Sequence, residues 1–318
     1  MPPFNSLPSL GKFGKISFGL QTLVGTAVPA TMALRYNGQG ASPTGNVTRT
    51  NDSIADGTVY ATRSRTQGQR WVDKSIGFEV EHTNMLFLFA AMFGAPTAGV
   101  FTPPNGNFAP LAPGQPLTLE WTYPGFPIVV KDVQISEISI TNNQRAVFTG
   151  SLTAHGTRFD PLTTPANTAV PNGTVYRYQD HYIRVDLSAD GLGGYQTVVP
   201  ESSSIQIMNP MSPKDGSQGY TPADAPFVVG FERSPGVGIS GTFSLPGAQK
   251  PFYDLMISNS VVKLIYGMKI GSQLIEFTMP TCEIEAVDPP ATLDQIVTPI
   301  KFKTASVGGA IPFTILTA

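Results

Sequence analysis

Gly77–Phe93 reads GFEVEHTNMLFLFAAMF, a short alternating run that leads straight into a continuous apolar segment. The alternation over Gly77–His82 is typical of a half-buried strand, and the apolar run Met85–Phe93 favours a helix that is covered on most sides. Thr83 or Asn84 can cap the start of this helix, and the glycine that follows can end it. The stretch therefore predicts a strand followed at once by a buried helix.

The same order recurs in the second half of the chain. Gly241–Leu245 (GTFSL) is the alternating run, and Lys250–Ser258 (KPFYDLMIS) is a more amphipathic helix candidate. Three strand-like runs follow each helix candidate: Pro116–Tyr123, Gly125–Ile140 and Arg145–His155 in the first half, and Ser260–Met268, Gln273–Val287 and Gln295–Ala305 in the second. The offset of roughly 160 residues is the length of a small domain and is too long for a solenoid repeat.

We therefore predict an all-β-dominated fold of two tandem β-sandwich or half-barrel domains, each with one flanking helix. The expected domains are residues 1–160 and 161–318. Val28–Tyr36 is the expected first strand of the first domain. Phe159–Gly173 has the Pro, Thr and Asn content of a linker, and Val175–Ser188 alternates as the opening strand of the second domain.

The composition supports this fold class. Only 13% of the 318 residues are charged, while 32 glycines and 29 prolines indicate many turns between short strands. The net charge is −2 and no basic block occurs, so tight nucleic-acid binding is not expected. The sequence contains no run of 18 apolar residues, so it predicts no membrane span. The first residues lack the apolar core of a secretory signal.

Residues that could carry chemistry are scattered. His82, His155 and His181 are not in a metal-ligand spacing, and the single cysteine, Cys282, is expected to act as a small buried hydrophobe. Gly236–Gly241 matches G-x-G-x-x-G, but a strand follows it where a dinucleotide site needs a helix. We therefore expect no enzyme, no cofactor and no metal site.

Two pairs of glutamates stand at i and i+2 on predicted strands, Glu79 with Glu81 and Glu283 with Glu285. Residues two apart on a strand share a face, so each pair could form a glycosidase-like carboxylate pair. A solvated acidic strip on the sheet is the better interpretation, and its recurrence in both halves would suit a surface that repels phosphate.

Four segments are expected to reach partners. The long polar loop Asn37–Gly57 follows the first strand, and Asn209–Ala225 is its counterpart in the second half. The apolar ends, Met1–Gly19 and Ala305–Ala318, are expected to be arms that pack on a sheet edge or on a neighbouring subunit. The contact candidates are Gln39, Pro43, Asn46, Arg49, Asp52 and Ile54 in the first loop, Met211, Lys214, Asp215 and Tyr220 in the second, and Phe4, Leu10, Phe13, Phe18, Ile311, Phe313 and Ile315 in the arms.

Several stretches resemble the tail tube proteins of long-tailed, siphovirus-type bacteriophages. GLQTLVGTAVPATMALRY looks like the G-T-x-x-x-P-T opening of that family, at Gly25, Thr26 and Pro29–Thr31. The resemblance continues through GFEVEHTNMLFLFAAMFG, VVKDVQISEISI and AVFTGSLTAHG, and in the second half through SSSIQIMNP, GISGTFSLPGAQKPFYDLM and LIEFTMPTCEIEAVD. It covers nearly the whole chain.

The resemblance implies two tandem tail-tube-like domains in one structural subunit of the virion tail. It implies trimeric, pseudo-hexameric rings that stack into a hollow conduit, with the chain itself and other tail proteins as partners, DNA only transiently in the lumen, no membrane, and assembly in the host cytoplasm. The expected lumen strands are Gln134–Ile140 with Val147–His155 and Thr281–Val287 with Ile296–Thr304, and the lumen candidates are Glu137, Glu283, Glu285, Lys301 and Lys303.

Two other classes share the composition. Another viral structural β-protein, such as a head decoration or tail terminator protein, would bind capsids or form closed rings without polymerising. A carbohydrate-binding β-sandwich would need exposed aromatic side chains beside the acidic pairs, and the aromatic cluster Trp121, Tyr123 and Phe126 is better explained as core or subunit interface.

Overall fold

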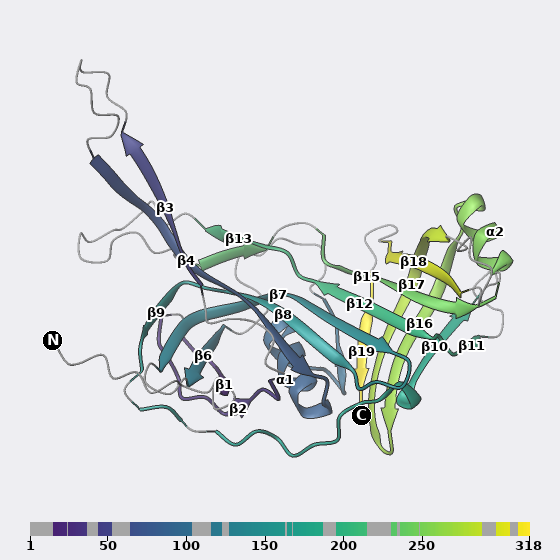
Figure 1. Ribbon diagram of the computed structural model, residues 1–318, viewed down its shortest axis with the longest axis horizontal. Helices are drawn as coiled ribbons and strands as arrows, with labels where there is room; N and C mark the ends of the chain where they lie inside the picture. The colour runs from purple at the N-terminus through teal and green to yellow at the C-terminus, as the bar shows by residue number, and fades with distance from the viewer. Residues whose placement is uncertain are drawn as a thin grey trace.

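The computed structural model describes residues 15–23, 25–36, 44–52, 64–103, 116–122, 127–162, 164–166, 168–186, 195–214, 230–233, 236–247, 249–287, 297–305 and 311–318 (Figure 1). Strands dominate, and each half carries one α-helix, which confirms the predicted fold class. One cluster of buried apolar side chains runs through both halves.

The elements of the first half follow one another along residues 15–161. They are β1 (Lys15–Leu20), β2 (Met32–Ala33), β3 (Thr44–Asp52), β4 (Ser64–Glu79), α1 (His82–Phe93), β5 (Val100–Phe101), β6 (Leu117–Thr122), β7 (Ile128–Asn143), β8 (Thr149–Gly156) and β9 (Arg158–Pro161).

The second half begins with a short 3-10 helix. Its elements are η2 (Tyr178–Asp180), β10 (His181–Asp186), β11 (Gln196–Val198), β12 (Ser202–Met208), β13 (Met211–Lys214), β14 (Gly230–Arg233), β15 (Gly238–Pro246), α2 (Lys250–Ser258), β16 (Val261–Ile270), β17 (Gln273–Val287), β18 (Val297–Thr304) and β19 (Thr314–Thr317).

The two halves use the same antiparallel strand pairings. β1 pairs with β2 and β6, and β10 pairs in the same way with β11 and β16. The order β6, β7, β8, β4 in the first half corresponds to β16, β17, β18, β15 in the second. β9 joins β7, and β19 joins β17. In each half the helix follows β4 or β15, as the sequence predicts.

One long strand in each half belongs to two layers. The first residues of β7 pair with β6 and β9, and its later residues pair with β8 and β12. A β-bulge between Ile135 and Glu137 lies just after this change of partners. β17 has a similar bulge between Ile284 and Ala286 opposite β18. Bulges bend a strand and increase its twist, so each bulge lets one strand serve both layers.

The pairing of β7 with β12 joins the halves. Glu137–Asn143 of β7 runs antiparallel to Ser202–Met208, with Ile138 opposite Ile207 and Ile140 opposite Ile205. The strands β4, β8, β7, β12, β15, β18 and β17 therefore form one uninterrupted sheet, which we call the main sheet.

The two helices differ in their surroundings. In α1 the Glu81 carboxylate accepts a hydrogen bond from the Asn84 N–H, and Gly94 ends the helix with φ of 90°. Glu81 is therefore the N-cap, rather than Thr83 or Asn84 as predicted. Eight residues of α1 are buried. In α2 only Phe252 is buried, and it packs against Phe243. Figure 1 shows α1 within the body of the molecule and α2 at its far right end.

Several predicted segments differ from the structure. The last part of the predicted arm Met1–Gly19 belongs to strand β1. It is a strand rather than an arm because it pairs antiparallel with β6. The predicted loop Asn37–Gly57 contains β3, which pairs with β4 in a two-stranded ribbon that projects from the body (Figure 1). The predicted loop Asn209–Ala225 likewise contains β13, paired with β14. Polar composition hid these hairpins, because a two-stranded ribbon does not need an apolar face to satisfy its backbone hydrogen bonds.

The junction between the halves also differs. The predicted linker Phe159–Gly173 begins with β9, and the predicted strand Val175–Ser188 is a 3-10 helix followed by β10. Tyr176 pairs with the first half instead, since its N–H donates to the Val80 carbonyl and its carbonyl accepts from the Phe148 N–H. The predicted strand Val28–Tyr36 reduces to β2 and an isolated bridge at Tyr36.

Candidate functional site

Small polar side chains cover one face of the main sheet. Because side chains alternate along a strand, residues in register on neighbouring strands share a face. One row across five strands consists of Ser151, Ser139, Gln206, Ser240 and Lys303. The next row consists of Thr149, Thr141, Ser204, Thr242 and Lys301. We call this surface the polar sheet face.

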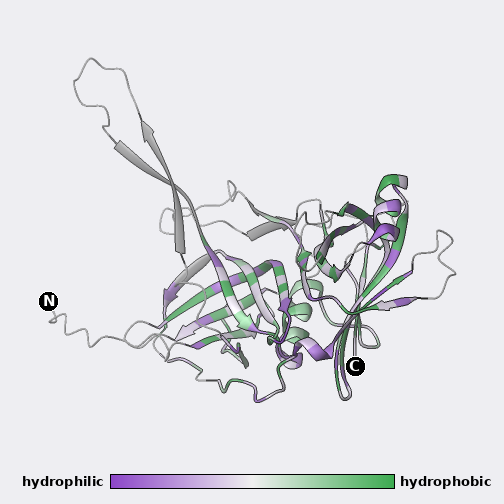
Figure 2. Ribbon diagram, turned by 45° about the vertical axis from the view of Figure 1, so that its right-hand side comes forward, coloured by the Kyte–Doolittle hydropathy of each residue, from purple (hydrophilic) through white to green (hydrophobic). Residues whose placement is uncertain are grey.

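The opposite face of the same strands is apolar and buried. It carries Ile138, Ile140, Leu152, Ile205, Ile207, Ile239, Phe243, Ile300 and Phe302, all part of the core. Figure 2 shows the resulting alternation of green and purple along the strands. The register is therefore held by burial, since a slip by one residue would turn every polar side chain into the core.

Two cross-strand pairs of phenylalanine and glycine hold the sheet closely packed. Phe78 on β4 lies opposite Gly150 on β8, and Phe302 on β18 lies opposite Gly241 on β15. A Cβ on Gly150 would lie 2.5 Å from the Phe78 ring, so the aromatic side chain occupies the space above the glycine. The second half has the same kind of pair with the positions reversed, because its glycine lies on β15, the counterpart of β4, and its phenylalanine lies on β18, the counterpart of β8.

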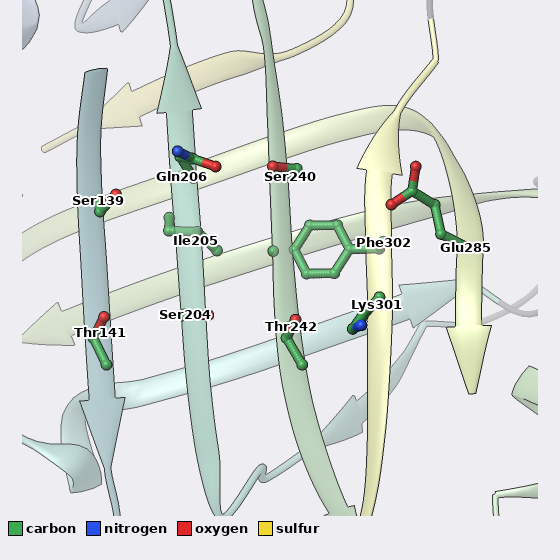
Figure 3. A pocket seen from close by; sticks show the side chains of 11 residues that line it. Ser139, Thr141, Ser204, Ile205, Gln206, Ser240, Thr242, Glu285, Lys301 and Phe302 are labelled. Atoms are coloured by element: carbon green, nitrogen blue, oxygen red, sulfur yellow. The ribbon is translucent and has the colours of Figure 1, made fainter. Parts of the chain in front are cut away.

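The centre of the polar sheet face is a shallow depression of about 410 Å³. Figure 3 shows side chains from β7, β12, β15, β18 and β17 around it. Its polar lining residues are Ser139, Thr141, Ser204, Gln206, Ser240, Thr242, Glu285 and Lys301. The depression offers hydroxyl and amide groups and lies across the junction of the two halves.

The charged groups on this face are few and are mixed in sign. Glu137 accepts a hydrogen bond from the Ser139 hydroxyl at 2.9 Å. The Lys303 ammonium lies 3.3 Å from Glu285, and Lys303 is also in register with Glu283. An exposed pair of this kind adds little stability, but it cancels charge locally. The face is therefore close to neutral rather than an acidic strip.

The five lumen candidates all lie on this face, on β7, β17 and β18. Sequence reasoning missed the hydroxyl-bearing residues between them. The signal was present in SSSIQIM, where Ser204 and Gln206 alternate with Ile205 and Ile207.

The expected glutamate pair Glu79 with Glu81 does not form. Glu79 lies 2.8 Å from Arg35 on the surface, whereas Glu81 is fully buried as the cap of α1. The strand ends at Glu79, so the alternation that would place the two carboxylates together stops there.

The loop candidates are placed only in part. Asn46, Arg49 and Asp52 lie along β3, and Met211 and Lys214 lie at the two ends of β13. The remaining candidates, Gln39, Pro43, Ile54, Asp215 and Tyr220, lie outside the described residues.

Three arm candidates belong to the core of their own chain. Phe18, Phe313 and Ile315 are fully buried, so their side chains are not on the surface of the protomer. Phe313 packs edge to face on Phe93, because β19 lies between β17 and β5. Ile311 is half-buried, and Phe4, Leu10 and Phe13 lie outside the described residues.

The segment Gly25–Thr31 (GTAVPAT) is held in place by hydrogen bonds to buried carboxylates. Asp132 accepts from the Gly25 N–H at 2.7 Å and from the Thr157 hydroxyl at 2.9 Å. Glu120 accepts from the Ala30 N–H at 3.0 Å. Hydrogen bonds to ionised acceptors are stronger than neutral ones, so the pattern ties the start of the chain to β6 and β7.

Asp73, His155 and Ser136 lie in the order of a catalytic triad. His155 Nδ1 is 2.6 Å from Asp73, and its Nε2 is 2.9 Å from the Ser136 hydroxyl. The Ser136 hydroxyl also donates to the Thr153 carbonyl at 3.3 Å, so it is held between two strands. The group therefore joins β4, β8 and β7 at the bulge.

The other titratable groups of interest are buried. Burial raises the pKa of the Cys282 thiol to about 12, which suits a structural residue, and lowers the pKa of His181 to about 3. In the part of the chain that the structure describes, no three His, Cys, Asp or Glu side chains converge as a metal site. No helix among the described residues is long and apolar enough to cross a membrane.

No curated protein matches the chain. Residues 13–310 match the model of the family described as phage tail tube protein, so the chain belongs to this family of structural tail components rather than to an enzyme family.

Proposed function

We propose that three copies of this chain form a ring with pseudo-sixfold symmetry, and that such rings stack into the hollow tube of a siphovirus-type tail through which DNA passes. The observation that carries this proposal is the main sheet, to which the two halves contribute corresponding strands side by side. The matched pairings support a duplicated tube domain, with the division near residue 160. A duplicated subunit needs three copies where a single-domain subunit needs six.

The polar sheet face suits the wall of a DNA conduit. Tight binding of DNA requires several lysines or arginines on the phosphates, and it strengthens with their number. This face offers mainly hydroxyl and amide groups, and its lysines stand beside glutamates. DNA could therefore slide past with its hydration shell intact, neither held by a basic track nor strongly repelled.

The projecting hairpin β3–β4 is the proposed contact between stacked rings. It extends beyond the body of the molecule (Figure 1), and β13–β14 is its shorter counterpart. The proposed contact residues remain those of the two hairpin regions, including Asn46, Arg49, Asp52, Met211 and Lys214. Further partners are other tail proteins, and the rings assemble in the host cytoplasm.

Electron microscopy of the purified protein at high concentration tests the proposal. Rings with a central hole should appear, with threefold symmetry from the chain and an approximate sixfold appearance from its halves, and stacked rings should form hollow filaments. A protein that stays monomeric at every concentration would contradict it. Rings that never stack would instead favour a terminator-like role.

A further inference from the structure

At the junction between the halves, two elements of the first half, β7 and α1, are covered by the second half, and both elements have counterparts in the second half, β17 and α2. The first contact is the pairing of Glu137–Asn143 on β7 with β12. In the second contact, the ring of Phe89 on α1 meets Phe277 on β17 edge to face with centroids 5.8 Å apart. Both contacts place a surface of the first half against the second half.

The helix of the second half lacks the corresponding cover among the described residues. Met85 and Phe89 are the fourth and eighth residues of α1, and both are fully buried. Tyr253 and Ile257 hold the same positions in α2, yet they are 47% and 67% exposed. The inner side of α2 is packed on β17, so only its outer side is left uncovered.

The strand beside this helix also has an open side. The last residues of β17, Ile284–Val287, pair with β18 on one side. On the other side no strand from the described residues pairs with them, whereas the corresponding side of β7 holds β12. An uncovered strand edge beside exposed apolar side chains is a surface suited to strand addition.

We propose that this α2–β17 surface, made of Tyr253, Ile257 and the edge Ile284–Val287, binds the first half of a second copy of this chain. The inference rests on the proposed function and specifies how its ring closes. The repeat indicates what binds there. In the first half, α1 and β7 are covered by the second half of the same chain, and because both halves have the same strand pairings, a first half can cover α2 and β17 in the same way. The only first half that can reach α2 without displacing α1 from its own partner belongs to another copy.

The correspondence also predicts the order of contact. β17 before its bulge covers α1, and its counterpart in the first half is β7 before its bulge, Ile128–Val133. Ile257 should therefore lie against β6 and the first residues of β7 of the second copy. The segment that enters the first hairpin, at Arg35 and Tyr36, corresponds to β12 and should lie along Ile284–Val287. Such a head-to-tail contact uses two different surfaces and can close into a ring.

Site-specific photo-cross-linking tests the contact directly. A benzophenone amino acid at position 257 is irradiated in concentrated full-length protein, and the linked peptides are identified by mass spectrometry. The expected product is a dimer joined to the first half, within residues 117–122 or 128–133. Links confined to the second half would overturn the proposal. The same probe at Val199, which is 60% exposed, is the control and should give at least tenfold less of this product.

An Ile257→Asp variant, with Val199→Asp as its matched control, provides the second measurement. Position 257 is exposed, so the monomer should keep its circular dichroism spectrum and its unfolding midpoint. We expect the protein concentration needed for ring formation to rise at least tenfold for Ile257→Asp and to stay within twofold for the control. If wild-type rings form and Ile257→Asp forms them equally well, this inference is wrong and the tube function stands. If wild-type protein forms no rings, the tube function itself fails.

Discussion

Phe89 and Phe277 lie edge to face at 87°, one on the helix of the first half and the other on the long strand of the second. Both rings are fully buried, and Phe101 packs on Phe89 at 5.8 Å from a third element. The two halves therefore share one core at this point. Folding of the first half alone would uncover the side of Phe89 that Phe277 covers.

Replacing Phe277 should destabilise the whole chain rather than only the second half. We expect Phe277→Ala to cost about 3–5 kcal/mol, because it removes a buried ring and leaves a cavity between the halves. Urea unfolding followed by fluorescence and by circular dichroism measures the loss. Val199→Ala, at an exposed position, should change stability by less than about 0.5 kcal/mol. A small loss for Phe277→Ala, or two separate transitions with only one shifted, would argue against a shared core.

The buried Asp132 should stabilise the start of the chain. It accepts hydrogen bonds from Gly25 and Thr157, and each bond to a charged acceptor contributes about 1.5–3 kcal/mol. Asp132→Ala should lower the free energy of unfolding by at least the contribution of one such bond, about 1.5 kcal/mol. Because Thr157→Val removes one of the same bonds, the double variant should lose less than the sum of the single losses. Additive losses would show that the two groups do not interact.

Acid should destabilise the chain through His181. Burial between Phe148 and Tyr266 lowers its pKa from 6.5 to about 3. Below about pH 6.5 the unfolded chain takes up a proton that the folded chain does not, so this group lowers the free energy of unfolding by up to about 1.4 kcal/mol per pH unit, until about pH 3. His181→Phe should make the fall in unfolding midpoint from pH 7 to pH 5 shallower. An unchanged slope would exclude His181 as its source.

Positive charge on the polar sheet face should slow DNA passage. Ser139, Gln206 and Ser240 lie in one row, and the triple lysine variant would create a basic track that binds phosphate. In phage assembled with this variant, genome ejection should be slower or incomplete, and added salt should restore it. Lysines at the exposed positions Gln196, Thr197 and Val199 carry the same charge elsewhere and should leave ejection unchanged. Equal ejection from both variants would place the polar sheet face outside the bore.

Local patterns determined most of the elements. The run from Gly77 to Phe93 specified a strand and a covered helix, and α1 ends where the glycine signal placed its end. The boundaries of α2 and β17 also follow the predicted ranges, since proline in the first turn and strict alternation are strong local signals. The recurrence of these patterns predicted which strands would correspond, and the family match confirmed the resemblance to phage tail tube proteins.

Long-range pairing decided the rest. No local signal in Ser202–Met208 predicts that this strand pairs with β7 as well as with β15. That pairing depends on which strand edge lies beside it once both halves have folded. The same holds for Phe18, Phe313 and Ile315, whose apolar character fits a core as well as an interface until the strands around them are placed. The amino-acid order by itself determined what each segment becomes, through backbone preference and alternation. Only the tertiary structure decided which face is left polar and which helix is left uncovered, because burial depends on residues far apart in the chain.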